Sequence, residues 1–398
     1  MKKKTYADAP KGFYFSTAEA AIKKPGRKDL ALIYSEVEAA MAGAFTTNRV
    51  KAAPVRIDMR KIKSGRGQSI IVNSGNANAC SGEQGLRDAN EMAGSVSKSL
   101  HIKPSLVYVS STGVIGSRMP MERIRPAITE LVSGVGRSSF EDVAAAIMTT
   151  DTFPKIVKKK VRVGDQTGTI AGICKGAGMI CPNMATMLSF ILTDIAVEKK
   201  ALDRALLSAV KKSFNRLTID GDMSTNDTVL LMANGVLGNT PVTEKNEAYL
   251  RFSRALSELT IELSKMIARD GEGATKFIEV EVKGARNDFD AEKAALAVAN
   301  SNLVKTAIYG NDANWGRIMA ALGYSGVLFR EDLVDIFFGR VKIVDNGLAT
   351  GKDKQAGDVL KNKEVNIVID LHAGKASAKV FTCDLTEGYI RINAEYRT

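Results

Sequence analysis

Short apolar runs rich in β-branched residues alternate with amphipathic helical stretches along this 398-residue chain. The alternation is typical of proteins in which strands and helices share a core, so we expect an α/β or α+β fold. The pattern predicts strands at Leu30–Tyr34, Ser69–Asn73, Leu106–Ser110, Lys155–Val163, Met187–Ile195 and Thr228–Met232. It predicts helices at Gln84–Leu100, Met121–Ser133, Phe140–Thr149, Lys199–Phe214, Ala248–Ala268 and Asp290–Ala299.

The pattern shifts toward strands after about residue 280. The strands predicted there are Phe277–Val282, Leu303–Tyr309, Val334–Val344, Val365–Leu371 and Ala378–Cys383. Because the chain is longer than one core usually supports, we expect a smaller, strand-rich C-terminal lobe beside a larger one.

The charge balance is basic, with 56 Lys and Arg against 44 Asp and Glu and a formal net charge of +12. A nucleic-acid partner would require a clustered basic face or a binding motif, and neither is evident. The basic residues gather at Met1–Lys4, Lys155–Arg162 and Lys199–Lys212, where they fit the solvated sides of strands or helices. We therefore expect no nucleic-acid partner, and a weak steering of small anions such as amino-acid carboxylates.

Histidine and cysteine are scarce. The two histidines, His101 and His372, leave little material for a metal site or a Ser/His/Asp triad, so a nucleophile here must find another base. The cysteines show neither paired CxxC spacing nor the density of a disulfide framework, and we expect them to be reduced and buried. They are Cys80, Cys174, Cys181 and Cys383.

The N-terminal lysines are not followed by an apolar stretch, so the segment does not resemble a signal peptide. No uncharged apolar run approaches about 18 residues, the length that indicates a membrane span. We expect a soluble, cytoplasmic protein with no membrane partner.

Glycine-rich loops beside Asn, Ser and Thr follow several predicted strands, at Asn73–Cys80, Ser110–Gly116 and Lys175–Met179. Such loops let backbone N–H groups approach a ligand closely, although each one alone is more often a tight turn.

The most informative segment is Lys175–Leu188, in which a glycine-rich stretch leads through Ala185 into Thr186 and an apolar run. Attack of the Thr186 hydroxyl on the Ala185 carbonyl would cut the chain and give Thr186 a free α-amine. With an ordinary pKa near 8, that amine is a usable base, so one residue would hold both nucleophile and base. From the pattern alone, the simpler interpretation is that Thr186 opens a buried strand.

The segment Gly-Ala-Gly-Met-Ile-Cys-Pro-Asn-Met-Ala-Thr-Met-Leu resembles the cleavage site of the ornithine acetyltransferase (glutamate N-acetyltransferase) family. Eight further segments resemble that family in the expected order over nearly the whole chain. They are Phe45–Asn48, Asn73–Cys80, Ser111–Gly116, Met148–Thr152, Gly221–Asp227, Arg269–Lys276, Tyr309–Arg317 and Ile392–Thr398.

The resemblance implies an N-terminal-nucleophile-like αββα sandwich of two mixed sheets with outer helices, plus a smaller strand-rich C-terminal domain. It implies self-cleavage between Ala185 and Thr186, which gives an α chain, residues 1–185, that holds the oxyanion hole and substrate residues. The β chain would hold the nucleophile and sandwich core in residues 186–280 and the strand-rich domain in residues 281–398. The mature enzyme would be a heterotetramer of two α and two β chains.

The implied reaction transfers the acetyl group of N²-acetyl-L-ornithine to L-glutamate through an acetyl-threonine intermediate on Thr186, in the cyclic pathway of arginine biosynthesis. Thr112 and Gly113 resemble the oxyanion hole, although a strand-ending turn is the simpler interpretation of these two residues. No metal or cofactor is implied. Some family members are multifunctional and also use acetyl-CoA as acetyl donor, which the residues leave open here.

The resemblance also implies a set of substrate-binding residues. Lys175 would meet the substrate near the cleavage site, by pairing with its α-carboxylate, and Glu272 would meet the amino groups of ornithine. On pattern alone the first is a solvated lysine and the second a turn glutamate. The implied set is Thr152, Lys175, Thr186, Glu272, Asn393 and Thr398, with Asp151 a weaker candidate that orients its neighbours.

Two other functions remain in view. A self-cleaving aminopeptidase or amidase of the same architecture would pass the acyl group to water instead of glutamate. A non-enzymatic anion- or nucleotide-binding protein fits poorly, because no GxxxxGK[ST] loop is present and Lys175–Met179 precedes a strand.

Overall fold

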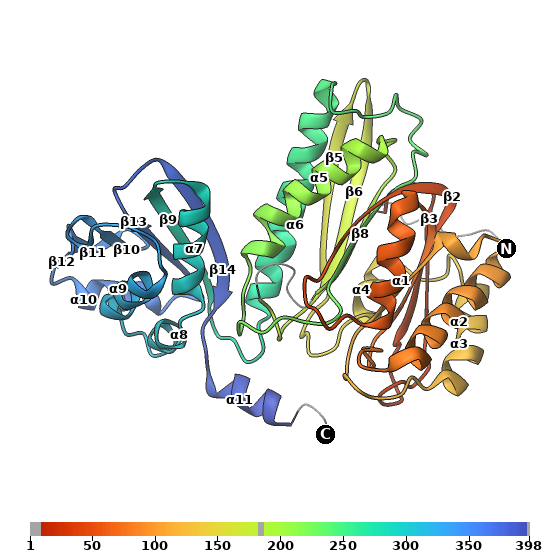
Figure 1. The fold of residues 1–398 in the computed structure, drawn as a ribbon, viewed down its shortest axis with the longest axis horizontal. Coiled ribbons are helices and arrows are strands. Elements are labelled where there is room, and N and C mark those ends of the chain that lie inside the picture. Colours follow the sequence, from red (N-terminus) through yellow and green to blue (C-terminus); the bar gives the residue numbers. More distant parts are fainter. Residues whose placement is uncertain (1–8, 182–186, 396–398) are drawn as a thin grey trace. The chain divides into compact units, whose positions relative to one another are not determined.

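The computed structural model describes residues 9–181 and 187–395 of the chain. These residues divide into two compact units (Figure 1). Among the described residues, the first unit comprises residues 9–176, 187–215 and 223–263, and the second comprises residues 177–181, 216–222 and 264–395. The predicted α and β chains are defined by a cut in the backbone between residues 185 and 186. The two compact units are defined by contacts and do not bear on that cut.

The first unit is built on an eight-stranded mixed sheet in the order β4-β3-β2-β8-β7-β6-β5, with β1 paired to β2. Its strands are β1 (Phe13–Ala18), β2 (Leu30–Phe45), β3 (Arg66–Asn73), β4 (Val107–Ser111), β5 (Lys155–Val163), β6 (Gln166–Lys175), β7 (Leu188–Thr193) and β8 (Thr228–Ala233). The helices are α1 (Ala53–Lys61), α2 (Gly82–Leu100), α3 (Met121–Ser133), α4 (Phe140–Ala146), α5 (Lys199–Lys212) and α6 (Glu247–Arg269), of which α6 continues into the second unit.

Strand β2 is long enough to take part in both sheet layers of the first unit. Its first half pairs with β1 and β3, and residues 40–45 pair with β8. The core between the layers includes Ile70 and Val72 of β3 together with Ile173 of β6, whereas Ile71 faces the other way, into a core formed with α1, α2 and α3. Leu259 of α6 packs against β6 on the opposite layer. The unit is therefore a sandwich of two sheet layers with outer helices, as the resemblance implied.

Parallel strand pairs determine which loops meet. β3 and β4 run parallel, so the loops that follow them emerge at the same edge of the sheet. β7 and β8 are also parallel, and β6 is antiparallel to β7. In consequence Lys175 pairs with Leu188, Leu188 with Thr228, and Thr228 with Phe45, in register across four neighbouring strands.

The second unit contains a six-stranded mixed sheet in the order β12-β11-β10-β13-β9-β14. Its strands are β9 (Phe277–Ala285), β10 (Asp335–Phe338), β11 (Val341–Asp345), β12 (Leu348–Ala349), β13 (Glu364–Asp370) and β14 (Ala376–Cys383). The helices are α7 (Asp288–Ala299), α8 (Asn302–Tyr309), α9 (Trp315–Tyr324), α10 (Asp353–Leu360) and α11 (Glu387–Ala394). The buried alanines of α7 let this helix pack closely on β9 and β14.

Most predicted elements are present, but the prediction of a strand at Leu303–Tyr309 is wrong. This segment is helix α8, which Ser301 caps by accepting a hydrogen bond from the Val304 N–H, 3.3 Å away. Val304, Ala307 and Ile308 are buried on one helical face, so their three- and four-residue spacing outweighs β-branched composition. The predicted strand Val334–Val344 is a hairpin of β10 and β11.

The prediction for the cysteines holds in part. No disulfide joins the four of them, all of which lie in the described ranges. Cys174 and Cys383 are buried, but Cys80 is exposed and Cys181 is half-buried, which corrects the expectation of four buried thiols.

None of the helices formed by residues 9–181 and 187–395 is long and apolar enough to cross a membrane.

Candidate active site

The predicted oxyanion residues, Thr112 and Gly113, directly follow β4. The loop after the parallel strand β3 lies against them, because the Thr112 N–H donates to the Asn73 carbonyl at 3.0 Å. The Ser111 hydroxyl donates to Asn73 Oδ1 at 2.6 Å, and Asn73 Nδ2 donates to the Asn76 carbonyl at 2.8 Å. These hydrogen bonds connect the Asn73–Cys80 loop to the end of β4 and fix the backbone at Thr112.

Gly113 occupies a backbone conformation that favours glycine, with φ at +133°. A Cβ atom at this position would lie 2.3 Å from the carbonyl carbon of Gly75 and 2.5 Å from the Asn76 nitrogen. Only glycine permits this approach of the two loops, and the conformation sets the direction of the Gly113 N–H.

Lys175 contacts the predicted oxyanion residue directly. Its Nζ donates a hydrogen bond to Thr112 Oγ1 at 3.0 Å, and both side chains are buried. Since Oγ1 accepts this bond, the hydroxyl proton of Thr112 is available to a different acceptor. Lys175 is thus placed beside the oxyanion group, and the interpretation of it as a solvated lysine is wrong.

Asp151 anchors the backbone next to Lys175. Its Oδ1 accepts from Lys155 Nζ at 2.6 Å and from the Gly176 N–H at 2.7 Å, and its Oδ2 accepts from the Thr149 N–H at 3.0 Å. Burial favours the neutral carboxyl, but the charges of Lys175 and Lys155 and these hydrogen bonds outweigh it and lower the pKa of Asp151. The expected orienting role of Asp151 fits this arrangement.

The two residues Lys155 and Thr152 near Asp151 differ in burial. Lys155 belongs to a basic cluster expected to be solvated, yet its side chain is fully buried in the ion pair with Asp151. Thr152, a predicted substrate residue, follows Asp151 in the chain and is exposed.

Asp227 is a site residue that sequence reasoning missed, although the Gly221–Asp227 motif contains it. The side chain is fully buried, and its Oδ1 accepts the Met187 N–H at 3.0 Å. Thr228 N–H donates to the Met187 carbonyl at 3.1 Å, which completes the pairing of the two strand ends. The residue that follows the predicted nucleophile is therefore held on both its amide and carbonyl sides.

Burial raises the pKa of Asp227 well above its usual value. The Met187 amide, the Thr46 and Ser224 hydroxyls and the charge of Lys175 act in the opposite direction but do not compensate for burial.

In the second unit, Glu272 packs against the glycine-rich segment Ala177–Met179. The Glu272 N–H donates to the Ala177 carbonyl at 2.8 Å. A Cβ atom on Gly178 would lie 2.2 Å from Glu272 Oε2, so any larger residue at position 178 would force the Glu272 carboxylate to move. Asn393 Nδ2 on α11 donates to Glu272 Oε2 at 2.8 Å. The structure thus brings together Glu272 and Asn393, two of the predicted substrate residues.

Asp220 fixes the same segment from another side. Its carboxylate accepts the N–H groups of Met179 at 2.6 Å and Ile180 at 2.8 Å, and the hydroxyl of Tyr389 on α11 donates to it at 3.2 Å. Burial raises the pKa of Asp220. The segment 177–180, which precedes the predicted cleavage site in the sequence, therefore contacts both the Glu272 loop and Asp220, which in turn binds α11.

The structure says less about the other residues singled out by the sequence. Trp315 packs against the core of the second unit. Ala185, Thr186 and Thr398 lie outside the described residues, so the predicted cleavage site, nucleophile and C-terminal contact remain predictions.

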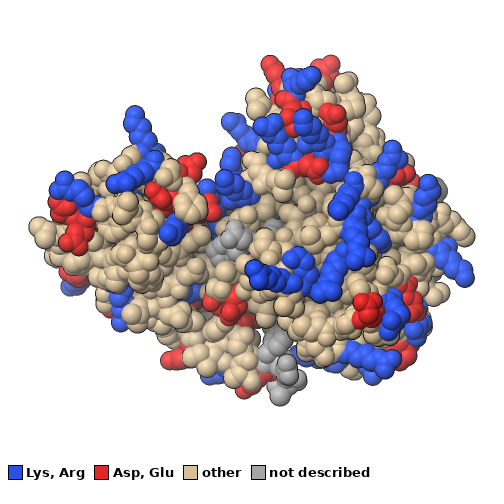
Figure 2. Space-filling model, viewed as in Figure 1, with Lys and Arg blue, Asp and Glu red and all other residues tan. Residues whose placement is uncertain are grey.

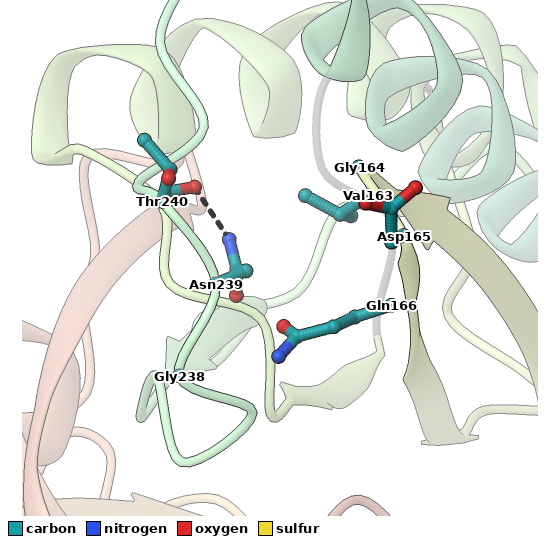
Figure 3. A pocket seen from close by; sticks show the side chains of 7 residues that line it. All are labelled: Val163, Gly164, Asp165, Gln166, Gly238, Asn239 and Thr240. Atoms are coloured by element: carbon teal, nitrogen blue, oxygen red, sulfur yellow. Dashed lines mark hydrogen bonds between the residues drawn. The ribbon is translucent and has the colours of Figure 1, made fainter.

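Pockets in the first unit lie apart from most of these residues. One of about 350 Å³ lies between the turn that joins β5 to β6 and the loop Gly238–Thr240 that follows β8 (Figure 3). In that loop Asn239 Nδ2 donates to the Thr240 carbonyl at 2.7 Å. Gln166 lines it, whereas Lys175 lies at the other end of β6, roughly 30 Å along the strand. Another, of about 500 Å³, reaches Asp151 and is lined in part by Arg27.

Within the described ranges, no group of three or more His, Cys, Asp or Glu side chains is arranged to hold a metal ion.

The profile of the ArgJ family matches residues 14–398. The chain belongs to the ArgJ family. It is 54% identical over 390 residues to the arginine biosynthesis bifunctional protein ArgJ of Geobacter sulfurreducens, covering 98% of this chain and 99% of that protein. It is 50% identical over 396 residues to the protein of the same name from Caldanaerobacter subterraneus, with 98% of each covered. The family resemblance drawn from the sequence is thus confirmed.

A solved ArgJ structure from Bacillus halodurans supports the fold. It is 46% identical and superposes with a TM-score of 0.52, covering 52% of this chain and 99% of the solved chain. The α/β architecture therefore agrees with that of an ArgJ protein.

Proposed function

We propose that this protein transfers the acetyl group of N²-acetyl-L-ornithine to L-glutamate in arginine biosynthesis. Membership of the ArgJ family and 54% identity to an arginine biosynthesis bifunctional protein support the pathway. The observation that carries the chemistry is the contact of 3.0 Å from Lys175 Nζ to Thr112 Oγ1, at the edge of the sheet where β7 begins. It places a polarised hydroxyl donor near the start of the strand that Thr186 precedes.

In the proposed reaction the Thr186 hydroxyl attacks the acetyl carbonyl of acetylornithine, and the α-amine of Thr186 accepts the hydroxyl proton. The tetrahedral intermediate expels ornithine, whose leaving nitrogen takes that proton, and leaves an acetyl ester on Thr186. The amine of glutamate then attacks the ester, which releases N-acetylglutamate and restores the hydroxyl. Two half-reactions through one covalent intermediate predict ping-pong kinetics.

Thr112 and Gly113 are the proposed oxyanion donors, through one hydroxyl and one backbone N–H. Each half-reaction develops negative charge on the acetyl oxygen, so fixed donors stabilise the transition state more than the ground state. The Lys175 ammonium strengthens the Thr112 donor by polarising its oxygen, because hydrogen bonds in a chain reinforce one another.

Substrate binding is proposed for Thr152, Lys175, Glu272, Asn393 and Thr398. Glu272 offers a carboxylate to the amino groups of ornithine, and Asn393 holds it by the hydrogen bond to Oε2. Lys175 is proposed to pair with the substrate α-carboxylate. Neither a metal nor a cofactor enters these steps, and acetyl-CoA as an additional acetyl donor is a separate activity to assay.

The protein is also proposed to cut itself between Ala185 and Thr186, which supplies the free α-amine. Support comes from the Bacillus halodurans structure, since 99% of its solved chain matches only 52% of this one, as expected if that protein consists of two polypeptides. We further propose a heterotetramer of two α and two β chains in the cytoplasm.

The excess positive charge is proposed to steer the amino-acid substrates weakly. Lys and Arg side chains form a band on the face of the first unit that Figure 2 shows. The exposed basic residues of α1 and α5 are Arg56, Arg60, Lys200, Arg204, Lys211 and Lys212. Such steering predicts a rate of substrate capture that falls as salt is added.

Incubation with acetylornithine and glutamate tests the proposal. We expect stoichiometric ornithine and N-acetylglutamate, and glutamate-dependent turnover. Release of free acetate without N-acetylglutamate would instead identify an amidase of the same architecture, and no reaction with either acceptor would contradict the proposal.

A further inference from the structure

Helix α11 carries Asn393, a proposed substrate residue, yet it contributes nothing to the core of its unit. None of the residues Glu387–Ala394 is buried, and Figure 1 shows the helix apart from the six-stranded sheet of the second unit. Most helices in proteins are held in place by packing of an apolar face. The hydrogen bonds of α11 therefore matter more for its position than they would in a helix that packs on a core.

The first of these contacts anchors the start of α11 on the loop after Glu272. The Thr386 hydroxyl donates to the Gly273 carbonyl at 2.6 Å and accepts the Gly388 N–H at 3.1 Å. The backbones of the loop and the helix also lie close together, since a Cβ atom on Gly273 would lie 2.3 Å from the Tyr389 nitrogen. The first turn of α11 is thus held against the loop that presents Glu272.

The second contact comes from the side chain of Tyr389, whose hydroxyl donates to Asp220 Oδ2 at 3.2 Å. Asp220 is itself held by three backbone N–H groups, those of Met179 at 2.6 Å, Ile180 at 2.8 Å and Asp222 at 3.1 Å. Its carboxylate is therefore a fixed acceptor that cannot follow a movement of the helix. Burial and the charge of Asp220 raise the pKa of Tyr389, so the hydroxyl remains a donor at neutral pH.

Tyr389 and Asn393 are four residues apart, so their side chains lie on the same face of α11. Asn393 Nδ2 donates to the Tyr389 carbonyl at 3.0 Å and to Glu272 Oε2 at 2.8 Å. A helix anchored at Thr386 alone could turn about its axis, and that turn would carry Asn393 away from Glu272. The bond from the Tyr389 hydroxyl to Asp220 opposes this rotation.

We propose that Tyr389 is a positioning residue for substrate binding. Its hydrogen bond to Asp220 fixes the rotation of α11, so that Asn393 holds the Glu272 carboxylate in the orientation that receives a substrate amino group. The proposal rests on the proposed function, because it takes Glu272 as a substrate-binding residue. Tyr389 acts through Asn393 and touches no substrate.

Tyr389→Phe tests the proposal, because it removes the hydroxyl alone and leaves the half-buried ring in place. The matched control is Tyr14→Phe in the first unit, which removes a tyrosine hydroxyl that also donates to a carboxylate, Glu36 Oε2, at 3.0 Å. For each variant, kcat and KM for acetylornithine are measured with glutamate at saturation. Self-cleavage is followed by intact mass, and the melting temperature is recorded.

We expect Tyr389→Phe to raise KM for acetylornithine by about 3- to 10-fold, the range that corresponds to the loss of one hydrogen bond. Its kcat, self-cleavage and melting temperature should stay close to those of the wild type, and Tyr14→Phe should keep the wild-type KM. An unchanged KM in Tyr389→Phe would overturn the proposal, whatever happens to kcat or to the melting temperature. An equal rise of KM in Tyr14→Phe would overturn it as well.

A double substitution tests whether Tyr389 acts through Asn393. Asn393→Ala should itself raise KM, and adding Tyr389→Phe should raise it little further, because effects on one chain of contacts are not additive. If the two increases multiply in full, Tyr389 acts independently of Asn393 and the proposal is wrong. A wild type that transfers no acetyl group from acetylornithine to glutamate would contradict the proposed function itself, whereas an active wild type beside an unaffected Tyr389→Phe contradicts this inference alone.

Discussion

The Lys175 ammonium donates a hydrogen bond of 3.0 Å to the Thr112 hydroxyl oxygen in a buried environment. The two residues are 63 positions apart and come from β6 and from the end of β4. Because the ammonium occupies a lone pair of Oγ1, the hydroxyl is left as a donor, which is the property that an oxyanion hole requires.

Removing the Thr112 hydroxyl should therefore slow the chemical step. We expect Thr112→Val to reduce kcat by about 10²–10³, equivalent to ~2.7–4 kcal/mol, which is the usual effect of losing one oxyanion donor. Thr112→Ser should retain most of the rate. Steady-state kinetics of acetyl transfer provide the readout, and a Thr112→Val enzyme with unchanged kcat would remove Thr112 from the hole.

Glu272 should determine the affinity for acetylornithine. Glu272→Gln removes the negative charge but keeps an acceptor for Asn393 Nδ2, so we expect the fold and self-cleavage to persist. Hydrogen bonds to charged groups contribute about 1.5–3 kcal/mol, so KM for acetylornithine should rise by about 10- to 100-fold. KM is measured with glutamate held at saturation.

The control for that substitution is Glu279→Gln in the same unit. Glu279 pairs with Lys265 at 2.7 Å and with Lys379 at 2.8 Å, which makes it a structural carboxylate. We expect it to lower the melting temperature and leave KM unchanged. Equal KM values for both variants and the wild type would show that Glu272 does not bind substrate.

Asp151 should make the free energy of unfolding depend on pH in the acidic range. Burial favours its neutral form, but Lys175 and Lys155 lower its pKa below the unfolded value of 3.8. A lowered pKa means that its stabilising contribution is fully present above 3.8 and is lost as the pH falls through the pKa of the folded protein. Asp151→Asn should therefore be less stable than wild type above pH 3.8, with a difference that shrinks at lower pH. Urea denaturation at several pH values measures this, and a constant difference would argue against the ion pairs as its cause.

Much of the fold is predictable from local pattern, because strands such as Lys155–Val163 and helices such as Met121–Ser133 end where their periodicity ends. The strand predicted at Leu303–Tyr309 is a helix because its buried residues recur at three- and four-residue spacing, although its β-branched residues favour a strand. Ser301, which caps α8, was the overlooked signal.

The family resemblance, and not the residue pattern, implied roles for Thr112, Gly113, Lys175 and Glu272. Pattern alone favoured turns and a solvated lysine at these positions, and contacts that depend on strand pairing could not be predicted from any single motif. The bond from Met187 to Asp227 joins residues 40 positions apart, and it exists only because β7 and β8 are parallel neighbours in register. The burial of Lys155 could not be predicted from the sequence either, because Lys160 and Arg162 in the same basic cluster on β5 are exposed.

Thr186→Ala should abolish both proposed activities at once. Without the hydroxyl, neither the cut after Ala185 nor an acetyl ester can form, so the variant should run as one full-length band on a denaturing gel and transfer no acetyl group. Thr186→Ser, which keeps a hydroxyl, should cleave and transfer at a reduced rate. Two bands from Thr186→Ala would contradict the assignment of the nucleophile.

The central claim is that backbone cleavage liberates Thr186 as nucleophile and base. Intact mass of the denatured, active wild-type protein, combined with N-terminal sequencing, tests it most directly. We predict two polypeptides with the masses of residues 1–185 and 186–398, the second beginning Thr-Met-Leu-Ser-Phe. A single uncut polypeptide with full transfer activity would contradict the account.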